Sequence, residues 1–224
     1  MHGFFITATG TDIGKTYLGC GLIRAWRARG LRVGAFKPVL SGFDPAKAAD
    51  SDAGQLLDAL GQVVSPQSLD GIAPWRYAAP LAPDAAAAKE GKRVEYEGVL
   101  AASRGFLDRA HDVALIEGAG GVMAPLSDDR TMLDWMADLR LPAILVAGSY
   151  LGTLSHSLTA LEVLKARQIP VALVVMNETE GSTVPLADNA AALARRWPAA
   201  PVHALARRAA PQAMAAIADA LLAG

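Results

Sequence analysis

Residues 3–17 read GFFITATGTDIGKTY, and this stretch decides the fold predicted for the whole chain. Its apolar start is typical of a buried strand, and after Tyr17 apolar residues recur at helical spacing. Between the two, the chain turns through a glycine-containing loop into Gly14, Lys15 and Thr16. A strand, a glycine loop, Gly-Lys-Thr and a helix in this order predict a phosphate-binding P-loop.

The chemistry of this loop suits a polyphosphate. The start of a helix offers unpaired backbone N–H groups and the positive end of the helix dipole. Gly14 allows close approach of the backbone, Lys15 can reach the outer phosphates, and the hydroxyl of Thr16 can bind Mg²⁺. The usual spacing has a glycine at position 9, which is Thr9 here, and the glycine stands at position 10. The alternative is an ordinary strand-to-helix turn.

Composition limits the classes of function. The 224 residues suit a single domain spanning residues 1–224, and no apolar run approaches the ~20 residues of a membrane span. Lys and Arg number 21 against 22 Asp and Glu, which argues against a nucleic-acid or membrane partner. The single cysteine, Cys20, excludes an internal disulfide framework, and the first residues do not resemble a signal peptide. We therefore expect a cytoplasmic enzyme or switch protein.

Strands and helices alternate along the whole chain. After the first strand, further strands are predicted at residues 31–37, 113–117, 142–147, 170–177 and 201–204. Helices are predicted at residues 15–29, 52–60, 84–90, 96–110, 131–139, 155–167, 184–197 and 211–222. Residues 38–51 read as a polar loop, and residues 63–80 as irregular. The strands are continuous apolar runs, which predicts an α/β fold with a doubly wound, mainly parallel sheet, helices on both faces and a P-loop NTPase-like architecture.

In such a sheet, ligands bind at the carboxyl ends of the strands. Lys37 ends one predicted strand, Glu117 ends another before a glycine-rich turn, and Gly148 and Asn177 follow two more. A second cation near a transferred phosphate would stabilise developing charge, although Lys37 could also simply leave the sheet for solvent. The carboxylate of Glu117 could hold Mg²⁺; alternatively, Glu117 is only a helix cap or turn residue.

Three further residues or segments have open interpretations. Asp52 lies in the first turn of a predicted helix, where it either compensates the helix dipole or completes a metal site with Thr16 and Glu117. The amide of Asn177 either pairs with a base edge or forms a turn. Residues 148–155 either bind a carboxylate through backbone amides or merely begin a helix.

With these residues laid out, the chain resembles the dethiobiotin synthetases, P-loop enzymes of biotin synthesis. Several motifs carry the resemblance in the same order: Gly14-Lys15-Thr16, KPVLSG at 37–42, SDA at 51–53, EGAGG at 117–121, PLSD at 125–128, Leu151-Gly152 and the strand-end Asn177. The resemblance implies that a homodimer converts 7,8-diaminononanoate and CO₂ or bicarbonate to a cyclic urea with ATP and Mg²⁺.

Site residues follow from the same resemblance. It implies catalytic roles for Lys37, Lys15, Thr11 and Ser41. It implies nucleotide contacts at Asp12, Ile13, Gly14, Lys15, Thr16, Tyr17, Asp52, Glu117, Gly118, Ala119, Gly120 and Asn177. It implies substrate contacts at Thr11, Lys37, Ser41, Gly152, Thr153, Leu154 and Ser155, the last four across the dimer interface, and Mg²⁺ ligands at Thr16, Asp52 and Glu117.

The chain departs from the family pattern in three places. Ala8, Gly10 and Asp12 differ from the residues often found at these positions, so we expect altered loop geometry with phosphate binding retained. Tyr150 stands where relatives often carry a basic residue, so binding of the substrate tail would rely on backbone amides. Leu205, Ala206 and Arg207 align where the family has Ile-Pro near the adenine, which leaves the base specificity open.

Two other classes share the fold. Nucleotide switch proteins of the partitioning or cell-division type carry an additional lysine early in the loop, and residues 7–13 contain none. Amide-forming ligases of the cobyrinate type carry a further domain with a nucleophilic cysteine, which the length and the lone Cys20 oppose. A ligase therefore remains the principal prediction.

Overall fold

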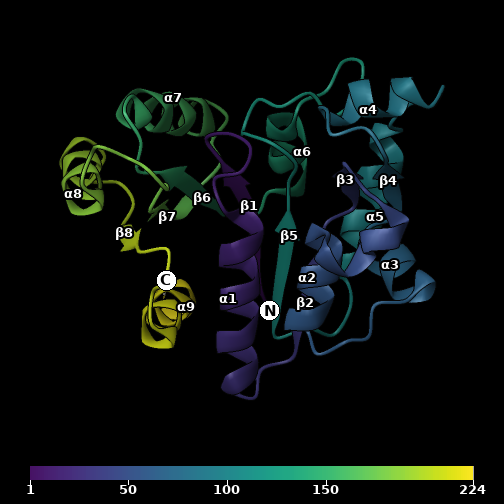
Figure 1. Cartoon of the computed structure of the whole chain (residues 1–224), viewed down its shortest axis with the longest axis horizontal. Coiled ribbons are helices and arrows are strands. Elements are labelled where there is room, and N and C mark those ends of the chain that lie inside the picture. The colour runs from purple at the N-terminus through teal and green to yellow at the C-terminus, as the bar shows by residue number, and fades with distance from the viewer. Residues whose placement is uncertain (224) are drawn as a thin grey trace.

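The computed structural model describes residues 1–223, and its centre is a six-stranded sheet in which each strand runs parallel to its neighbours (Figure 1). The strand order is β2-β5-β1-β6-β7-β8. The bounds are β1 (His2–Ala8), β2 (Val33–Phe36), β5 (Val113–Glu117), β6 (Ala143–Gly148), β7 (Val171–Asn177) and β8 (Val202–Leu205). The predicted doubly wound parallel sheet is confirmed.

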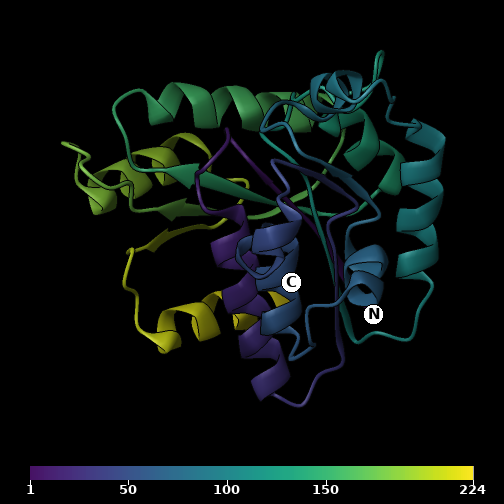
Figure 2. The same ribbon diagram turned by 45° about the vertical axis from the view of Figure 1, so that its right-hand side comes forward.

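Helices cover both faces of this sheet. One face carries α1 (Lys15–Ala28), α2 (Asp52–Ala59), α3 (Pro66–Ile72) and α9 (Pro211–Ala223). The other carries α4 (Pro83–Lys89), α5 (Tyr96–Leu107), α6 (Met132–Leu139), α7 (Thr153–Ala166) and α8 (Leu186–Arg196). The C-terminal α9 lies beside α1 (Figures 1 and 2), where the indole N–H of Trp26 donates to the carbonyl of Ala218 at 3.1 Å.

The first strand is apolar at successive positions because both of its faces are covered. Phe5 belongs to the core beneath α5 and α6, whereas Phe4 and Ile6 belong to the core beneath α1. Successive side chains of a strand point to opposite faces of the sheet, so a strand that is covered on both faces needs an apolar residue at every position. On α1, Leu18, Leu22 and Trp26 are fully buried at a spacing of four residues, which places them on one face of that helix.

A second, two-stranded parallel sheet lies outside the main one and corrects two predictions. Residues 38–51, predicted as a loop, contain β3 (Val39–Ser41) and a 3₁₀ helix (Pro45–Asp50). Residues 63–80, predicted as irregular, contain α3 and β4 (Trp75–Tyr77), and β4 pairs with β3. Strands of three residues are too short to show periodicity, and their pairing partners are distant in sequence.

Strand register brings polar residues together at one edge of the main sheet. Phe36 pairs with Ile116, so the next residue on each strand, Lys37 and Glu117, lie side by side. On the other side of β1, Asn177 pairs with Leu205 of β8. Within residues 1–223, no helix is both long enough and apolar enough to span a lipid bilayer.

Candidate active site

A cavity of about 740 Å³ opens at the carboxyl ends of β1 and β2, beside the start of α1; we call it the phosphate cavity. Predicted site residues form much of its lining: Thr11, Asp12, Gly14, Lys15, Thr16, Tyr17, Lys37, Ser41, Asp52, Ala119 and Gly120. The lining also includes Leu40 and Gly121 of the quoted motifs, and residues that sequence reasoning did not single out, among them Asp50, Ala124 and the segment 80–83. Residues from five separate stretches of the chain therefore meet at one cavity.

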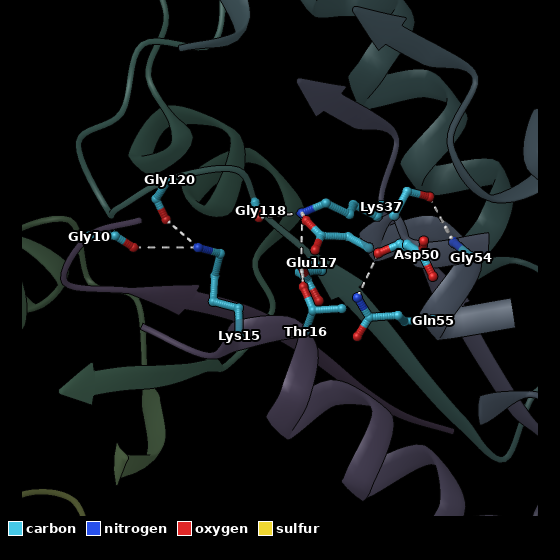
Figure 3. A network of polar contacts seen from close by, with 12 residues as sticks. Gly10, Lys15, Thr16, Lys37, Asp50, Gly54, Gln55, Glu117, Gly118 and Gly120 are labelled. Atoms are coloured by element: carbon cyan, nitrogen blue, oxygen red, sulfur yellow. Dashed lines mark hydrogen bonds and ion pairs between the residues drawn. The ribbon is translucent and has the colours of Figure 1, made fainter. Parts of the chain in front are cut away.

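Lys37 is the centre of a buried ionic cluster in the wall of this cavity. Its ammonium lies 2.8 Å from Oε1 of Glu117 and 3.2 Å from Oδ2 of Asp52, and it donates to the carbonyl of Gly118 at 3.3 Å (Figure 3). Burial opposes the charged form of Lys37, but the two carboxylates outweigh burial and raise its pKa. The same ammonium lowers the pKa of Asp52 against the effect of burial. Lys37 is thus held as a cation, and it does not extend into bulk solvent.

Glu117 joins this cluster to the P-loop. The hydroxyl of Thr16 donates to Oε1 of Glu117 at 2.7 Å, the same oxygen that Lys37 contacts. The other oxygen, Oε2, is buried and has no hydrogen-bond partner among residues 1–223. A buried, unpartnered carboxylate oxygen is costly unless a cation or a donor satisfies it. This observation fits a metal ion bound beside Thr16.

The donor set suits Mg²⁺ in particular. Thr16, Asp52 and Glu117 offer one hydroxyl and two carboxylates, all hard oxygen ligands. Among the residues that the structure describes, no group of three or more His, Cys, Asp or Glu side chains is placed to hold a metal. Mg²⁺ commonly binds through one or two carboxylates together with substrate phosphates, so this sparse set is compatible with it.

Lys15 lies on the other side of the P-loop from Lys37. Its ammonium donates to the carbonyl of Gly120 at 2.8 Å and approaches the carbonyl of Gly10 at 3.5 Å (Figure 3). Burial, followed by the positive charge of Lys37, lowers the pKa of Lys15 to about 8. An anion beside Lys15 would raise its pKa again and favour the charged form. Phosphate binding and protonation of Lys15 would therefore reinforce each other.

The glycine-rich turn after β5 packs directly on the P-loop. The N–H of Val122 donates to the carbonyl of Ala8 at 3.0 Å. A Cβ atom at Gly121 would lie 3.3 Å from backbone atoms of Ala8, Thr9 and Gly10. Gly121 therefore permits a close approach of the two backbone segments that a side chain would obstruct.

The start of α1 has a conformation that requires glycine. Gly14 adopts φ 95° and ψ 31°, and a Cβ there would lie 2.5 Å from Nδ2 of Asn177. That nitrogen donates to the carbonyl of Ile13 at 2.7 Å. Asn177 thus fastens β7 to the P-loop, while its Oδ1 is buried without a partner in the described part of the chain.

A second cavity, of about 540 Å³, lies between the P-loop and the ends of β7 and β8; we call it the base cavity. Four of the predicted nucleotide contacts besides Asn177 line it: Asp12, Ile13, Gly14 and Tyr17. It also contains 178–180 and 205–207. Residues 205–207 were already placed near the adenine by their position relative to the family pattern, whereas no sequence signal pointed to Glu178, Thr179 or Glu180.

The predicted carboxylate site lies apart from both cavities. Gly152, Thr153, Leu154 and Ser155 begin α7, two residues earlier than predicted, and line neither cavity. Gly152 caps this helix at φ 95° and ψ −8°, and Thr153 is buried with its hydroxyl donating to the carbonyl of Gly148. The adjacent Leu151 is 84% exposed. Within one chain, this helix start therefore does not reach the phosphate cavity.

Solved structures of low sequence identity share the fold. MinD, a cell division protein of Aquifex aeolicus, aligns with a TM-score of 0.60 at 13% identity, over 100% of this chain and 98% of its own. A nucleotide-binding protein of Archaeoglobus fulgidus, solved in complex with ADP, aligns with a TM-score of 0.51 at 14% identity, over 100% of this chain and 88% of its own. These similarities concern the fold alone, so the switch-protein alternative gains only weak support.

The parallel sheet and the Gly-Lys-Thr loop define a P-loop nucleotide-binding protein, and an AAA domain family model matches residues 2–212. ATP-dependent dethiobiotin synthetase BioD of Phenylobacterium zucineum is 52% identical over 83% of this chain and 80% of its own length. The protein of the same name in Acidiphilium cryptum is 45% identical over 90% of this chain and 91% of its own. The chain belongs to the AAA domain family and, within it, to the ATP-dependent dethiobiotin synthetases. The predicted family and the assignment as an ATP-dependent ligase are confirmed.

Proposed function

We propose that this chain is a cyclo-ligase that forms dethiobiotin from 7,8-diaminononanoate, CO₂ and ATP. One amine adds to CO₂ and loses a proton, which gives a carbamate. A carbamate oxygen attacks the γ-phosphorus of ATP and ADP leaves, which gives a carbamic-phosphoric anhydride. The second amine then attacks the carbonyl carbon, and phosphate leaves as the cyclic urea closes. The observation that carries this proposal is the convergence of Lys15, Lys37 and Glu117 beside the P-loop.

The two lysines supply the charge that this reaction needs. In-line phosphoryl transfer is catalysed mainly by positioning and by stabilising negative charge. Lys15, at the start of α1, would contact the outer phosphates, and Lys37 would contact the carbamate and the transferred phosphate. Both ammonium groups are buried, so they act in a medium where charge interactions are stronger than in water.

Thr16, Asp52 and Glu117 would hold Mg²⁺ together with the nucleotide. The metal ion supplies positive charge to the phosphate oxygens. Support comes from the unpartnered Oε2 of Glu117 and from the oxygen-only donor set. Thr11 and Ser41 line the phosphate cavity, and we propose that they position the diamine and the carbamate. The hydroxyl of Ser41 is buried and free of partners among the described residues, so it can contact a ligand.

The base of ATP would occupy the base cavity. Because Nδ2 of Asn177 donates to the carbonyl of Ile13, Oδ1 is the amide atom left without a partner among the described residues, and we propose that it accepts from the base. A buried acceptor requires a donor, and the 6-amino group of adenine provides one whereas the 6-oxo group of guanine does not. We therefore propose preference for ATP over GTP.

The carboxylate tail of the diamine would bind at the start of α7 in a partner subunit. Gly152, Leu154 and Ser155 present backbone N–H groups at that helix start, where no side chain caps the helix, while the N–H of Thr153 already donates to the carbonyl of Tyr150 at 3.1 Å. Their distance from the cavities of their own chain favours a site shared between two copies. A homodimer in the cytoplasm remains part of the proposal.

Steady-state kinetics with single omissions test this function. Phosphate release from ATP should require both 7,8-diaminononanoate and bicarbonate, and mass spectrometry should detect the cyclic urea. Release that is independent of the diamine, without urea formation, would contradict the ligase proposal.

The variant Lys37→Gln tests the catalytic cluster. Gln retains a hydrogen-bond donor towards Glu117 but lacks the charge, so we expect turnover to fall by about 10²-fold or more with ATP affinity largely retained. Lys89→Ala, an exposed lysine at the end of α4, is the matched control. Unchanged turnover in a folded Lys37→Gln protein would remove Lys37 from the mechanism.

A further inference from the structure

Residues 206–207 leave the sheet after β8 and form the wall of the base cavity next to Asn177. Three side chains, one from α1 and two from the segment after β7, contact this segment at Arg207. The backbone N–H of Arg207 donates to Oε2 of Glu178 at 3.0 Å. The hydroxyl of Tyr17 donates to the carbonyl of Arg207 at 3.4 Å, and the guanidinium of Arg207 lies 3.1 Å from Glu180.

Glu178 is itself held from both sides. Its own N–H donates to the carbonyl of Leu205 at 2.9 Å, which continues the pairing of β7 with β8. The N–H of the next residue, Thr179, donates to the buried hydroxyl of Ser149 at 3.0 Å. The backbone of Glu178 is thus held in place, and its carboxylate anchors the exposed residues 206–207.

Tyr17 links the same segment to the first turn of α1. It lines both the phosphate cavity and the base cavity, so it stands where the two meet. Through its hydroxyl, the helix that begins with Lys15 and Thr16 is connected to the wall of the base cavity. We call Tyr17, Glu178 and Arg207 the base strap.

We infer that the base strap positions the wall of the base cavity, and so sets affinity for the nucleoside part of ATP without taking part in phosphoryl transfer. This inference rests on the proposed use of ATP. It adds that Glu178 and Tyr17 act through the backbone of Arg207. The hydrogen bonds of the strap converge on the backbone of Arg207, which lines the base cavity and not the phosphate cavity. Losing them should therefore not alter the affinity of a bare phosphate chain.

Binding calorimetry with ATP and with inorganic tripolyphosphate separates these two ends of the site. Glu178→Ala removes a charged acceptor, and we expect it to weaken ATP binding by about tenfold. Glu178→Gln keeps an acceptor, and Tyr17→Phe keeps the ring, so each should weaken ATP binding by about threefold. Tripolyphosphate affinity should stay within about twofold of wild type in all three variants. Glu162→Ala, an exposed acid on α7 away from both cavities, is the matched control and should bind both ligands as wild type does.

In steady-state assays, the same variants should raise KM for ATP with kcat unchanged. Equal weakening of ATP and tripolyphosphate would show that the variants disturb the P-loop, and it would overturn the strap. Unchanged ATP affinity in Glu178→Ala would overturn it as well. If the wild-type protein binds tripolyphosphate but not ATP, the proposed function is wrong. If the wild-type protein binds ATP but the variants do not show the expected loss of ATP affinity, only the inference about the strap is wrong.

Discussion

At the scale of single residues, a few buried charges explain the site. Lys37 and Glu117 are both almost fully buried, and each is tolerated because the other lies 2.8 Å away. Removing one partner of such a pair leaves an uncompensated charge in the interior, which is strongly destabilising. Variants at this cluster should therefore keep the shape and hydrogen-bonding capacity of the side chain.

Glu117→Gln tests metal binding under this restriction. We expect the Mg²⁺ concentration for half-maximal activity to rise by about tenfold or more, since a charged ligand is lost. Activity measured against added Mg²⁺ gives this value, and thermal unfolding checks that the protein is folded. Glu97→Gln, on an exposed position of α5, is the control. An unchanged Mg²⁺ titration would remove Glu117 from the metal site.

Asp112 provides a prediction for stability against pH. It precedes β5 and accepts three hydrogen bonds from Arg32, which lower its pKa to about 2. Because the folded protein favours the ionised carboxylate, this stabilisation is present above pH 4 and disappears as the pH falls through about 2.

Urea unfolding of wild type and Asp112→Asn should therefore differ at pH 7 and converge towards pH 2. A difference that is constant across this range would show that the ion pair makes no pH-dependent contribution. The pair is exposed to solvent, so added salt should also reduce the difference at pH 7.

At the scale of elements, two helices start in the same way with different surroundings. Gly14 before α1 and Gly152 before α7 both have φ 95°. A side chain at either position would be strained, but only at Gly14 would it also meet another group, Nδ2 of Asn177 at 2.5 Å. Substitution of the two glycines can therefore separate the cost of backbone strain, which both positions share, from the effect of a contact with Asn177, which only position 14 has.

We expect Gly152→Ala to cost about 1–2 kcal/mol of unfolding free energy, the cost of left-handed backbone for a residue with a Cβ, and to leave ATP affinity unaltered. Gly14→Ala should cost more and should also weaken ATP binding, because it displaces Asn177. Urea unfolding and calorimetry measure the two effects. Equal ATP affinities for the two variants would contradict the linkage of Asn177 to the P-loop.

At the scale of the whole molecule, the proposed tail site makes activity depend on two copies. A symmetric dimer of this 23.3 kDa chain should sediment at twice that mass. Lys37→Gln should inactivate the cavity of its own subunit, and Ser155→Asp should repel the substrate carboxylate at the start of α7.

If each site uses α7 of the partner, a one-to-one mixture of these variants after subunit exchange should regain about one quarter of wild-type turnover, because half the dimers would carry one intact site. Each variant alone should remain inactive at saturating ATP. No recovery in a mixture shown to contain heterodimers would place the tail site within one chain.

Much of the fold was predictable because its signals are local. Continuous apolar runs in β1, β5, β6 and β7 reflect burial on two faces, and a helix follows each of them in the chain. The small β3–β4 sheet was missed because three-residue strands have no measurable period, and their pairing depends on residues more than thirty positions apart. For the site, Gly-Lys-Thr and the strand-end residues were recognisable, whereas the base strap had no local pattern.

The amino-acid sequence by itself determined that the chain forms a doubly wound sheet with a P-loop after its first strand. The spacing of apolar residues and the positions of glycines, which predict these features, involve only residues close together in the chain. Only the tertiary structure decided that Lys37 meets Glu117 across 80 positions, and that Lys15 meets Gly120. It also decided that Nδ2 of Asn177 donates to Ile13 of the P-loop, and that Asn177 lines the base cavity. The physical reason is that strand order and register, which depend on packing of the whole core, set these distances.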